Sequence, residues 1–538
     1  MIFMKIKQAS VNAEDMEKML AVSPYNRIAL EDIEPIGNVS MFDTTLRDGE
    51  QAPGIALSPE DKIRIATALD DLGVDAIEAG FAASSEAEKE TLRKIAGSRL
   101  DADVYSLARS VKADIDAVID TGLDCIHTFI ATSDLHMKYK LKMTPEQVKE
   151  RAVETVQYAK DHGLTVQFSC EDATRSDMNF MKEVLLAVQE AGVDSVNIPD
   201  TVGVITPRAM SYVISEIKKA VKVPISVHCH NDLGLALPNT IAAIESGASI
   251  CHVCINGIGE RTGNVALEEV ALNLFANYGV QTVDLSKIGQ TSKLVERITG
   301  FPMAYNKPIV GRNAFAHESG IHVHGVMNNT ATYEPFLPEL VGVDRKIVIG
   351  KHSGVHSVHG RLENLGIEFP EEKMEELMTS IKDIASGGKE IDDAELITIA
   401  DHIMWKKETI DEAVNLKEFA VFTGKDITST ATVTVDIAGK TRTVSEIGVG
   451  PVDAAINAIK KAVNDNMSME EYKLSAITGK SDSICEVTVM VKNVQDDCSM
   501  SVGKAVGLDI VETSVDATMA AINRDYARQR KNNGKNNC

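Results

Sequence analysis

Short apolar segments alternate with helical patterns through the first half of this 538-residue chain. Eight of these segments have the composition of buried strands, and each precedes a helical pattern. They are residues 39–42, 76–79, 104–107, 125–130, 165–169, 195–198, 225–227 and 250–255. Strand–helix alternation implies parallel strands joined by right-handed crossovers. A doubly wound sheet shares this local pattern, but eight units in about 250 residues favour one (β/α)8 barrel.

The helical patterns carry their own boundary signals. Ser58 is placed to cap the N-terminus of the first long helix with its side chain. Glycines stand where three of the helices should end, at Gly73, Gly192 and Gly247. We therefore expect an α/β protein with a TIM barrel over residues 38–283, whose functional site lies on the loops after the strands.

The remainder of the chain has a different pattern of predicted secondary structure. Residues 1–37 carry no sustained period, and we expect an N-terminal extension with a helix near residues 12–20. Residues 284–425 are expected to form helical linker subdomains. Alternating strand patterns then predict a C-terminal α+β domain over residues 426–527, followed by a polar tail at 528–538.

An internal duplication marks this C-terminal domain as a separate module. Val452-Asp-Ala-Ala-Ile-Asn-Ala-Ile459 aligns with Val515-Asp-Ala-Thr-Met-Ala-Ala-Ile522. Both stretches are predicted to be helical. Strand patterns precede them at residues 428–437 and 441–447 in the first half, and at 486–492 in the second.

Composition narrows the class of protein. The formal net charge of −24 argues against binding to nucleic acid or to an anionic membrane surface. No apolar run approaches the roughly 20 residues that span a bilayer, and the N-terminus lacks a signal-peptide layout, so the expected location is cytoplasmic. Cys251 and Cys254 have no second Cys-x-x-Cys pair with which to hold zinc, and we expect buried thiols.

One strand ending carries a pair of histidines. In Val227-His-Cys-His-Asn-Asp232, side chains alternate, so His228 and His230 face one side of the strand and Cys229 faces the other. Two imidazoles on one face are potential ligands for a divalent metal ion. Hydrogen-bonded core histidines are the alternative interpretation, and the other strand endings favour the metal.

Nearly every predicted strand ends in a possible acid, base or ligand, and in a barrel these positions share one face. They are Arg47, Asp48, Glu78, Arg109, His127, Glu171, Asp200, Thr201, His228, His230, Asn231, Asp232, Asn256, Glu260 and Asn264. Asp48 would complete a set of two imidazoles and one carboxylate, whose open positions suit Mn²⁺, Mg²⁺, Fe²⁺ or Zn²⁺. A 2-oxo acid could chelate such an ion, which would polarise its carbonyl. Arg47 could stabilise charge on a substrate oxygen, pair with Glu78 to brace the barrel mouth, or do both.

Several motifs resemble those of a known enzyme family. Phe42-Asp-Thr-Thr-Leu-Arg-Asp-Gly-Glu-Gln51 with Lys62, and Val227-His-Cys-His-Asn-Asp-Leu-Gly234, resemble the two signatures of the 2-isopropylmalate, homocitrate and citramalate synthases. Three further stretches are similar to motifs of the same family. They are Asn256-Gly-Ile-Gly-Glu-Arg-Thr-Gly-Asn264, His317-Glu-Ser-Gly-Ile-His322 and Thr332-Tyr-Glu334.

The resemblance implies a Claisen condensation in which acetyl-CoA adds to a 2-oxo acid and the thioester is then hydrolysed. A divalent cation (Mn²⁺, Mg²⁺ or Zn²⁺) would be the cofactor. Its implied ligands are Asp48, His228, His230 and Asn264. Arg47 would hold the keto oxygen beside its structural partner Glu78, Thr201 would bind the substrate carboxylate, and Glu171 matches the catalytic glutamate.

The resemblance also implies partners. His317 and Tyr333 match a catalytic His/Tyr pair that in this family enters the active site of a neighbouring subunit, so a homodimer is expected. The C-terminal duplication resembles the family's amino-acid-sensing regulatory domain, with leucine as the expected feedback effector. No nucleic acid or membrane partner is expected.

Three acceptors compete within this family: 2-oxoisovalerate, pyruvate and 2-oxoglutarate. The C-terminal domain counts against homocitrate synthases, many of which lack it. Glu78-Ala-Gly-Phe81 and Ile126-His-Thr-Phe-Ile-Ala-Thr-Ser133 look more like isopropylmalate than citramalate synthases, and favour 2-oxoisovalerate over pyruvate. A non-haem Fe(II) oxygenase also uses two histidines and a carboxylate, but the barrel pattern and Glu171 count against this class.

Overall fold

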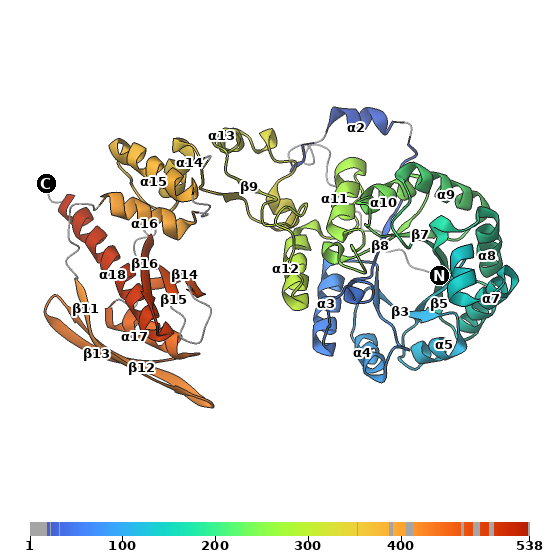
Figure 1. The fold of residues 1–538 in the computed structure, drawn as a ribbon, viewed down its shortest axis with the longest axis horizontal. Coiled ribbons are helices and arrows are strands. Elements are labelled where there is room, and N and C mark those ends of the chain that lie inside the picture. Colours follow the sequence, from blue (N-terminus) through green and yellow to red (C-terminus); the bar gives the residue numbers. More distant parts are fainter. Residues whose placement is uncertain are drawn as a thin grey trace. The chain divides into compact units, whose positions relative to one another are not determined.

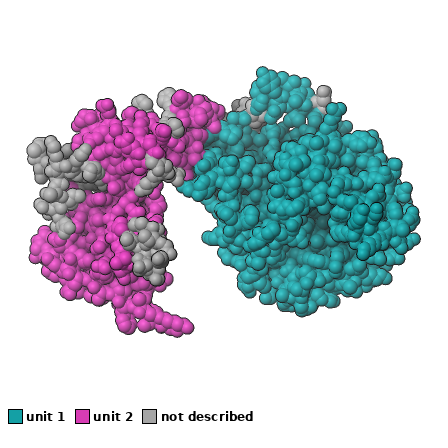
Figure 2. Space-filling view, in the orientation of Figure 1, with its two compact units in different colours: residues 1–315, 334–345 teal, residues 316–333, 346–538 magenta. Residues whose placement is uncertain are grey.

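The computed structural model describes most of the chain beyond its N-terminus. The described residues are 19–535 except 22, 32, 352, 387–390, 405–412, 464–466, 477–484 and 494–499. The chain forms two compact units, shown in different colours in Figure 2. One consists of Met1–Phe315 with Glu334–Arg345, and the other of Ala316–Tyr333 with Lys346–Cys538.

The first unit contains a closed barrel of eight parallel strands that follow one another in chain order (Figure 1). The strands are β1 (Ser40–Asp43), β2 (Ala76–Gly80), β3 (Asp103–Arg109), β4 (Cys125–Ala131), β5 (Thr165–Glu171), β6 (Ser195–Asp200), β7 (Ile225–Cys229) and β8 (Ile250–Val253). Pairing of β1 with β8, with Ser40 beside Ile250, closes the barrel. The predicted TIM barrel is confirmed, and each predicted strand overlaps an observed one.

Amphipathic helices cover the outside of the barrel (Figure 1). They are α3 (Pro59–Leu72), α4 (Glu86–Ala96), α5 (Lys112–Ile119), α7 (Pro145–Asp161), α8 (Met178–Glu190), α9 (Pro207–Ala220), α10 (Ala236–Glu245) and α11 (Leu267–Tyr278). Ser58 caps α3 as expected, because its Oγ accepts a hydrogen bond of 3.1 Å from the backbone N of Asp61. Gly73 ends the same helix with φ of +93°, a conformation that favours glycine.

Two kinds of interior lie on either side of the strands. Aliphatic side chains such as Ile65, Leu69 and Ile77 are fully buried between strands and helices. Inside the barrel, a small apolar cluster lies near the beginnings of several strands and includes Phe42 and Tyr105. Polar residues follow nearer the strand ends, and the ring of Phe42 stacks on His252 with centroids 4.2 Å apart. The interior thus becomes polar toward the candidate site.

The segment after the barrel is mainly helical. Its elements are α12 (Ile288–Thr299), β9 (Ala316–His317), α13 (Gly320–Asn328), β10 (Lys346–Ile347), α14 (Val355–Asn364), α15 (Met374–Ser386) and α16 (Asp393–Met404). Buried side chains of α14, α15 and α16 form a second hydrophobic core, which includes Leu362, Leu377 and Leu396.

The C-terminal domain is built from two similar halves. Each is a three-stranded antiparallel sheet followed by a helix. The first half is β11 (Val414–Gly424), β12 (Ile427–Ile437), β13 (Lys440–Gly448) and α17 (Pro451–Val463); the second is β14 (Met467–Ala476), β15 (Cys485–Asn493), β16 (Met500–Gly507) and α18 (Ile510–Lys535). The two aligned Val-Asp-Ala stretches lie in α17 and α18, so the duplicated α+β architecture is present.

Three strands of this domain were not anticipated. The sequence pattern predicts a helical region for the residues of β11 and no strand for those of β14 or β16. All three are edge strands, and their burial does not alternate, since β11 buries only Val414 and β16 buries three residues in succession. In the N-terminal extension, the expected helix lies almost entirely outside the described residues, and α2 (Pro24–Ala29) follows it. Within the described part of the chain, no helix is long and apolar enough to cross a membrane.

Candidate active site

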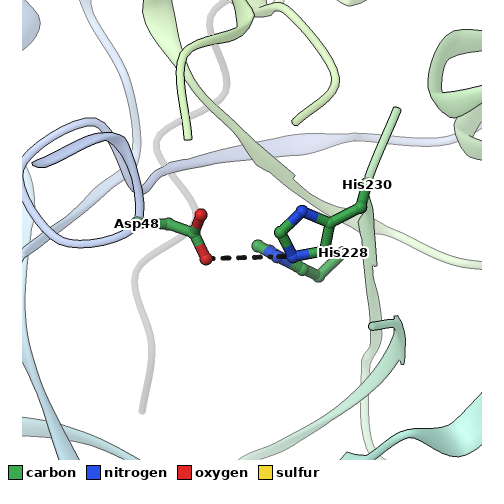
Figure 3. Close-up of side chains that lie close together, drawn as sticks. All are labelled: Asp48, His228 and His230. Carbon is green, nitrogen blue, oxygen red and sulfur yellow. Dashed lines mark hydrogen bonds and ion pairs between the residues drawn. The ribbon is translucent and has the colours of Figure 1, made fainter. Parts of the chain in front are cut away.

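Three buried side chains converge where β1 and β7 end (Figure 3). The Nε2 atoms of His228 and His230 are 3.2 Å apart, and Nε2 of His228 is 3.6 Å from Oδ2 of Asp48. All three residues are at least 94% buried. Among the described residues, this is the one cluster of three His, Cys, Asp or Glu side chains compact enough to hold a metal ion.

Charge and burial set the protonation of this cluster. Burial opposes ionisation of Asp48, but Arg47, the two histidines and the hydrogen bond from Asn264 together outweigh it and hold the pKa of the carboxyl well below its ordinary value. Burial and, to a smaller extent, the neighbouring His230 lower the pKa of His228 to about 3. The pKa of His230 is also lowered by burial. At neutral pH the cluster therefore offers one carboxylate and two neutral imidazoles.

Asn264 adds an oxygen to the same cluster. Its Nδ2 donates to Oδ1 of Asp48 at 2.9 Å and to the carbonyl oxygen of Ile258 at 3.2 Å. Its Oδ1 is buried and has no hydrogen-bond partner among the described residues. A buried amide oxygen without a donor is costly, and a cation would satisfy it.

The spacing of these atoms suits a divalent cation. Two nitrogens bound to one ion at about 2.1 Å, in tetrahedral or octahedral geometry, lie roughly 3.0–3.4 Å apart, and the two Nε2 atoms are 3.2 Å apart. The donor set of two imidazoles, a carboxylate and an amide oxygen contains no thiolate. Such a mixed set, with room for substrate, is typical of a catalytic rather than a structural metal site.

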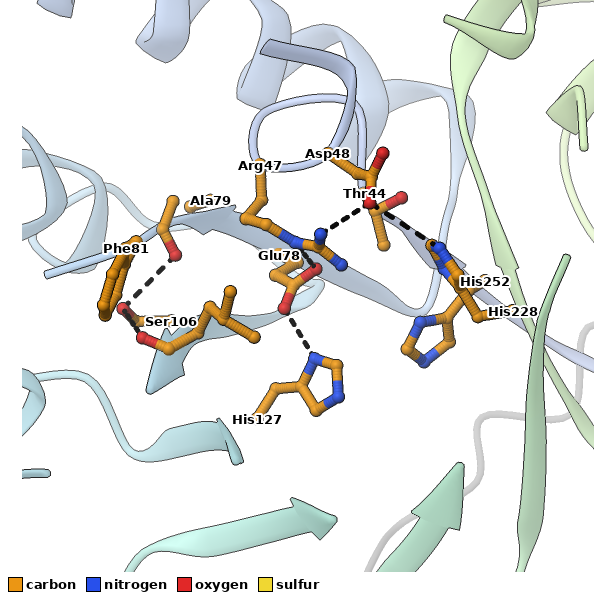
Figure 4. A network of polar contacts seen from close by, with 12 residues as sticks. Thr44, Arg47, Asp48, Glu78, Ala79, Phe81, Ser106, His127, His228 and His252 are labelled. Atoms are coloured by element: carbon orange, nitrogen blue, oxygen red, sulfur yellow. Dashed lines mark hydrogen bonds and ion pairs between the residues drawn. The ribbon is translucent and has the colours of Figure 1, made fainter. Parts of the chain in front are cut away.

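A buried polar chain connects Asp48 to the middle of the barrel (Figure 4). Arg47 donates from Nη1 to Oδ2 of Asp48 and from Nε to Oε2 of Glu78, both at 2.6 Å. Glu78 in turn contacts Nδ1 of His127 at 2.6 Å, and Nε2 of His127 contacts Oγ of Ser169 at 2.6 Å. Burial opposes ionisation of Glu78, but Arg47 and His127 lower its pKa to about 2. No described residue accepts a hydrogen bond from Nη2 of Arg47, so this group can bind a ligand oxygen.

Thr201 lies at the neighbouring strand ending, directly after β6. Its Oγ1 accepts a hydrogen bond of 2.9 Å from the backbone N of Asp172, which has φ of +62°. Its carbonyl oxygen accepts from Nη2 of Arg261, and the guanidinium of Arg261 also forms two bonds of 2.9 Å with the carboxylate of Asp232. These bonds leave the hydroxyl hydrogen of Thr201 available to an acceptor.

Glu171 is the last residue of β5, and its side chain is 17% exposed. Lys140 lies 2.5 Å from its Oε1, and Nδ1 of His136 lies 3.6 Å from the same oxygen. Sequence reasoning identified neither Lys140 nor His136. Both stand in the loop after β4, where the run Lys138-Tyr-Lys-Leu-Lys142 could have signalled a cationic turn above the barrel.

Several other strand-end candidates have structural partners. Nε of Arg109 pairs with the Asp114 carboxylate at 2.8 Å. Oδ1 of Asp200 accepts from the hydroxyl of Thr174 at 2.8 Å. The remaining candidates also form hydrogen bonds. Asn256 bonds to Ser292, Asn231 accepts from the backbone N of Ala236, and the backbone N of Glu260 donates to Asp48.

The two site candidates from beyond the barrel lie in the second unit. His317 is in β9, which pairs with β10. The ring of Tyr333 lies 4.2 Å from that of His322, and Tyr333 is 44% exposed. Their participation in a barrel site stays a prediction.

Three family models match successive parts of the chain. Residues 38–295 match the HMGL-like family, residues 309–389 match the homocitrate synthase post-HMGL domain-like family, and residues 390–526 match the LeuA allosteric (dimerisation) domain. The closed barrel and these matches define a protein with an HMGL-like barrel, a post-HMGL segment and a LeuA-type dimerisation domain.

Relatives that match over most of the chain identify the family. The chain is 48% identical to 2-isopropylmalate synthase of Methanocaldococcus jannaschii over 508 residues, which cover 94% of this chain and 98% of the relative. It is 49% identical over 497 residues to a probable 2-isopropylmalate synthase of Methanopyrus kandleri, covering 92% and 99%. The (R)-citramalate synthase of M. jannaschii is 44% identical over 490 residues, covering 90% and 99%. The chain belongs to the 2-isopropylmalate synthase family, whose members condense acetyl-CoA with a 2-oxo acid.

Proposed function

We propose that this protein condenses acetyl-CoA with 2-oxoisovalerate and hydrolyses the thioester to give 2-isopropylmalate and CoA, the first committed step of leucine biosynthesis. One observation carries the choice of acceptor. Within one organism, M. jannaschii, the chain is 48% identical to the 2-isopropylmalate synthase and 44% identical to the citramalate synthase, at similar coverage. The same comparison makes pyruvate the second candidate acceptor.

A divalent cation is part of this proposal. Its ligands would be Asp48, His228, His230 and the amide oxygen of Asn264, because their atoms converge and the Asn264 oxygen is buried without a donor. Mn²⁺, Mg²⁺ and Zn²⁺ all accept such a mixed nitrogen and oxygen set. When bound, the cation would act as a Lewis acid toward the carbonyl of the 2-oxo acid.

The remaining roles fall to residues around this cluster. Arg47, held by Asp48 and Glu78, would donate from Nη2 to the keto oxygen on which charge develops. Thr201 would donate its hydroxyl hydrogen to the carboxylate of the 2-oxo acid. Glu171 would accept the proton that leaves the methyl group of acetyl-CoA, as a general base at the end of β5.

We also propose that two chains assemble as a homodimer, since the match to an allosteric dimerisation domain supports it. His317 and Tyr333 of one subunit would then complete the site of its partner. The proposed domains are the catalytic barrel over residues 38–283, the linker region over 284–425 and the leucine-sensing domain over 426–527. Strand β11 lies before residue 426 but pairs with β12, so it is added to the leucine-sensing domain.

The decisive experiment is an assay of CoA thiol release from acetyl-CoA with each acceptor in turn. We expect the highest kcat/KM with 2-oxoisovalerate, and mass spectrometry should identify 2-isopropylmalate. Two methylene-sized groups separate it from pyruvate, each worth about 10–200-fold in discrimination. A preference for pyruvate would make the protein a citramalate synthase. Oxygen consumption without CoA release would instead indicate an Fe(II) oxygenase.

A further inference from the structure

Lys140 lies in the turn that follows β4, and its side chain reaches the carboxylate of Glu171 at the end of β5. Its Nζ is 2.5 Å from Oε1 of Glu171. The two residues are 31 positions apart in sequence and come from different elements. The ammonium of Lys140 also lies 6.0 Å from the centroid of the Phe129 ring. The pair is a cross-element contact at the candidate active site.

The turn that carries Lys140 has an uncommon geometry. Residues Met137–Leu141 form a π-helix directly after the short helix α6 (Asp134–His136), and Lys142 ends it with φ of +54°. Single π-helical turns occur frequently at functional sites, because they reorient side chains relative to an α-helix. Here the reorientation brings the side chain of Lys140 to Glu171.

Both ends of this segment are anchored. Oγ of Ser133 accepts from the backbone N of His136 at 3.2 Å and donates to Oδ2 of Asp172 at 2.6 Å. Met137 is 4% exposed, and its carbonyl oxygen accepts from the backbone N of Met143 at 3.2 Å. The turn that carries Lys140 is thus tied to Asp172, the residue that follows Glu171.

The contacts of Glu171 distinguish its two oxygens. The Lys140 ammonium at 2.5 Å and Nδ1 of His136 at 3.6 Å both approach Oε1. Within the described part of the chain, no hydrogen bond or ion pair reaches Oε2. Oε1 is therefore the anchored oxygen, and Oε2 is the one available for proton transfer.

We propose that Lys140 is a positioning residue for the condensation: it holds Oε1 of Glu171, so that Oε2 faces the methyl group of acetyl-CoA. This inference rests on the proposed function, in which Glu171 is the base. In that step a C–H bond of the methyl group breaks, an O–H bond forms on Oε2, and the electron pair remains on the thioester as an enolate. Lys140 stays an ammonium and exchanges no proton.

A simpler role for Lys140 would be to brace the turn. Its side chain is 51% exposed, and an exposed ion pair contributes little to stability. A pair that only braces the turn would leave kcat unaltered and would change the melting temperature little. A positioning pair would change kcat, because proton transfer requires a base within hydrogen-bond reach and in the correct orientation.

Three variants of the full chain separate these roles. Lys140→Met removes the ammonium at similar length, Lys140→Arg retains a cation, and Lys138→Met is the matched control two residues earlier in the same π-helix. The ammonium of Lys138 lies 5.1 Å from the centroid of the Tyr139 ring, on its own turn. We expect Lys140→Met to lower kcat by about 10–100-fold, the range for a displaced catalytic group, with KM for both substrates changed by less than about threefold and metal content unchanged. Lys140→Arg should stay within about fivefold of the wild type, and Lys138→Met should match it.

An isotope effect identifies the step that slows. With acetyl-CoA deuterated at its methyl group, the kinetic isotope effect on kcat measured for the Lys140→Met variant should be at least as large as that measured for the wild type, because proton transfer is the step affected. The inference is overturned if Lys140→Met retains the wild-type kcat, if its loss of rate comes with a smaller isotope effect, or if Lys138→Met loses as much. Wild-type protein that releases no CoA with any 2-oxo acid would overturn the proposed function itself.

Discussion

Asp43, the last residue of β1, and Asp48, in the loop that follows, are both buried, yet their environments favour opposite charge states. Asp48 is paired with Arg47 and remains ionised. Asp43 has no cation partner among the described residues, and its carboxylate accepts only from the backbone N and Oγ1 of Thr45, at 2.9 and 3.0 Å. Burial raises the pKa of Asp43 to about 7, and the negative charges of Glu268 and Glu78 contribute to the rise.

This raised pKa predicts a pH dependence of stability. The carboxyl of Asp43 binds its proton more tightly in the folded than in the unfolded chain, whose pKa is 3.8. Its contribution to stability is therefore complete below about pH 4 and is lost as the pH rises toward 7. Asp43→Asn removes the titration, so between about pH 5 and pH 8 the melting temperature of the wild type should fall more than that of the variant. Parallel curves by scanning calorimetry would contradict a protonated Asp43.

Gly259 shapes the proposed metal site without contributing a ligand. It has φ of +156°, and a Cβ there would lie 2.2 Å from Nδ2 of Asn264 and 2.9 Å from Oδ1 of Asp48. Gly259→Ala should lower metal affinity and kcat by about 10–100-fold, the range for groups that orient ligands. Gly54→Ala is the control, because Gly54 also has positive φ, at +96°, but open space around its Cβ position. Metal content after dialysis measures the difference, and equal metal loss in both variants would contradict the argument.

At the scale of elements, a buried lysine links the loop after β1 to two helices. Lys62 of α3 is 1% exposed. Its Nζ lies 2.6 Å from Oε2 of Glu50, in that loop, and 2.5 Å from Oε1 of Glu88, in the first turn of α4. Since Glu50 follows Asp48 by two residues, this ion-pair network stabilises the loop that presents Arg47 and Asp48.

Lys62→Met tests how much this network stabilises the barrel. Removing the cation leaves two partly buried carboxylates facing each other, so we expect the free energy of unfolding to fall by about 3 kcal/mol, the lower end for a broken buried pair. Arg64→Met on the same helix is the control. Arg64 is 55% exposed and pairs with Asp61 at 3.4 Å, a pair worth at most about 1 kcal/mol. Similar losses of stability in the two variants, measured by urea unfolding, would argue against a special role for Lys62.

At the scale of the whole molecule, one hydrophobic core joins the two halves of the C-terminal domain to each other, and another joins the second half to the helical region. One core combines Val433 and Ala454 of the first half with Val515 and Ile522 of the second. Another combines side chains of α14–α16 with Met490 and Val502 of β15 and β16. An effector bound to the duplicated sheets therefore has packed contacts through which to act on the linker helices.

We predict that leucine inhibits the full chain, with a coupling of typically 1–3 kcal/mol, or about 5–150-fold in affinity. A chain that ends after Met404 lacks both sheets and should not respond to leucine. This deletion uncovers the faces of α14–α16 that pack on Met490 and Val502, so its melting temperature must be measured beside its activity. Inhibition by isoleucine but not leucine would move the proposed acceptor to pyruvate.

Local periodicity was enough to predict the barrel and the two histidines of the proposed metal site. The strands were predictable because each is a short apolar run between helical repeats, and His228 and His230 were expected on one face because side chains alternate along any strand. The strands β11, β14 and β16 escaped prediction because burial does not alternate along them. Among the described side chains, only the first residue of β11 and of β14 is buried, and β16 buries Ser501, Val502 and Gly503 in succession.

Contacts between distant strand ends were decided only by the tertiary structure. The bond from Asn264 to Asp48 spans 216 positions, and the ion pair of Lys140 with Glu171 depends on a π-helical turn that has no local pattern. The opposite charge states of Asp43 and Asp48 follow from where the Arg47 side chain lies. Backbone geometry repeats along a chain and can be inferred from it, whereas the partner of each buried charge is set by packing between segments that are far apart in sequence.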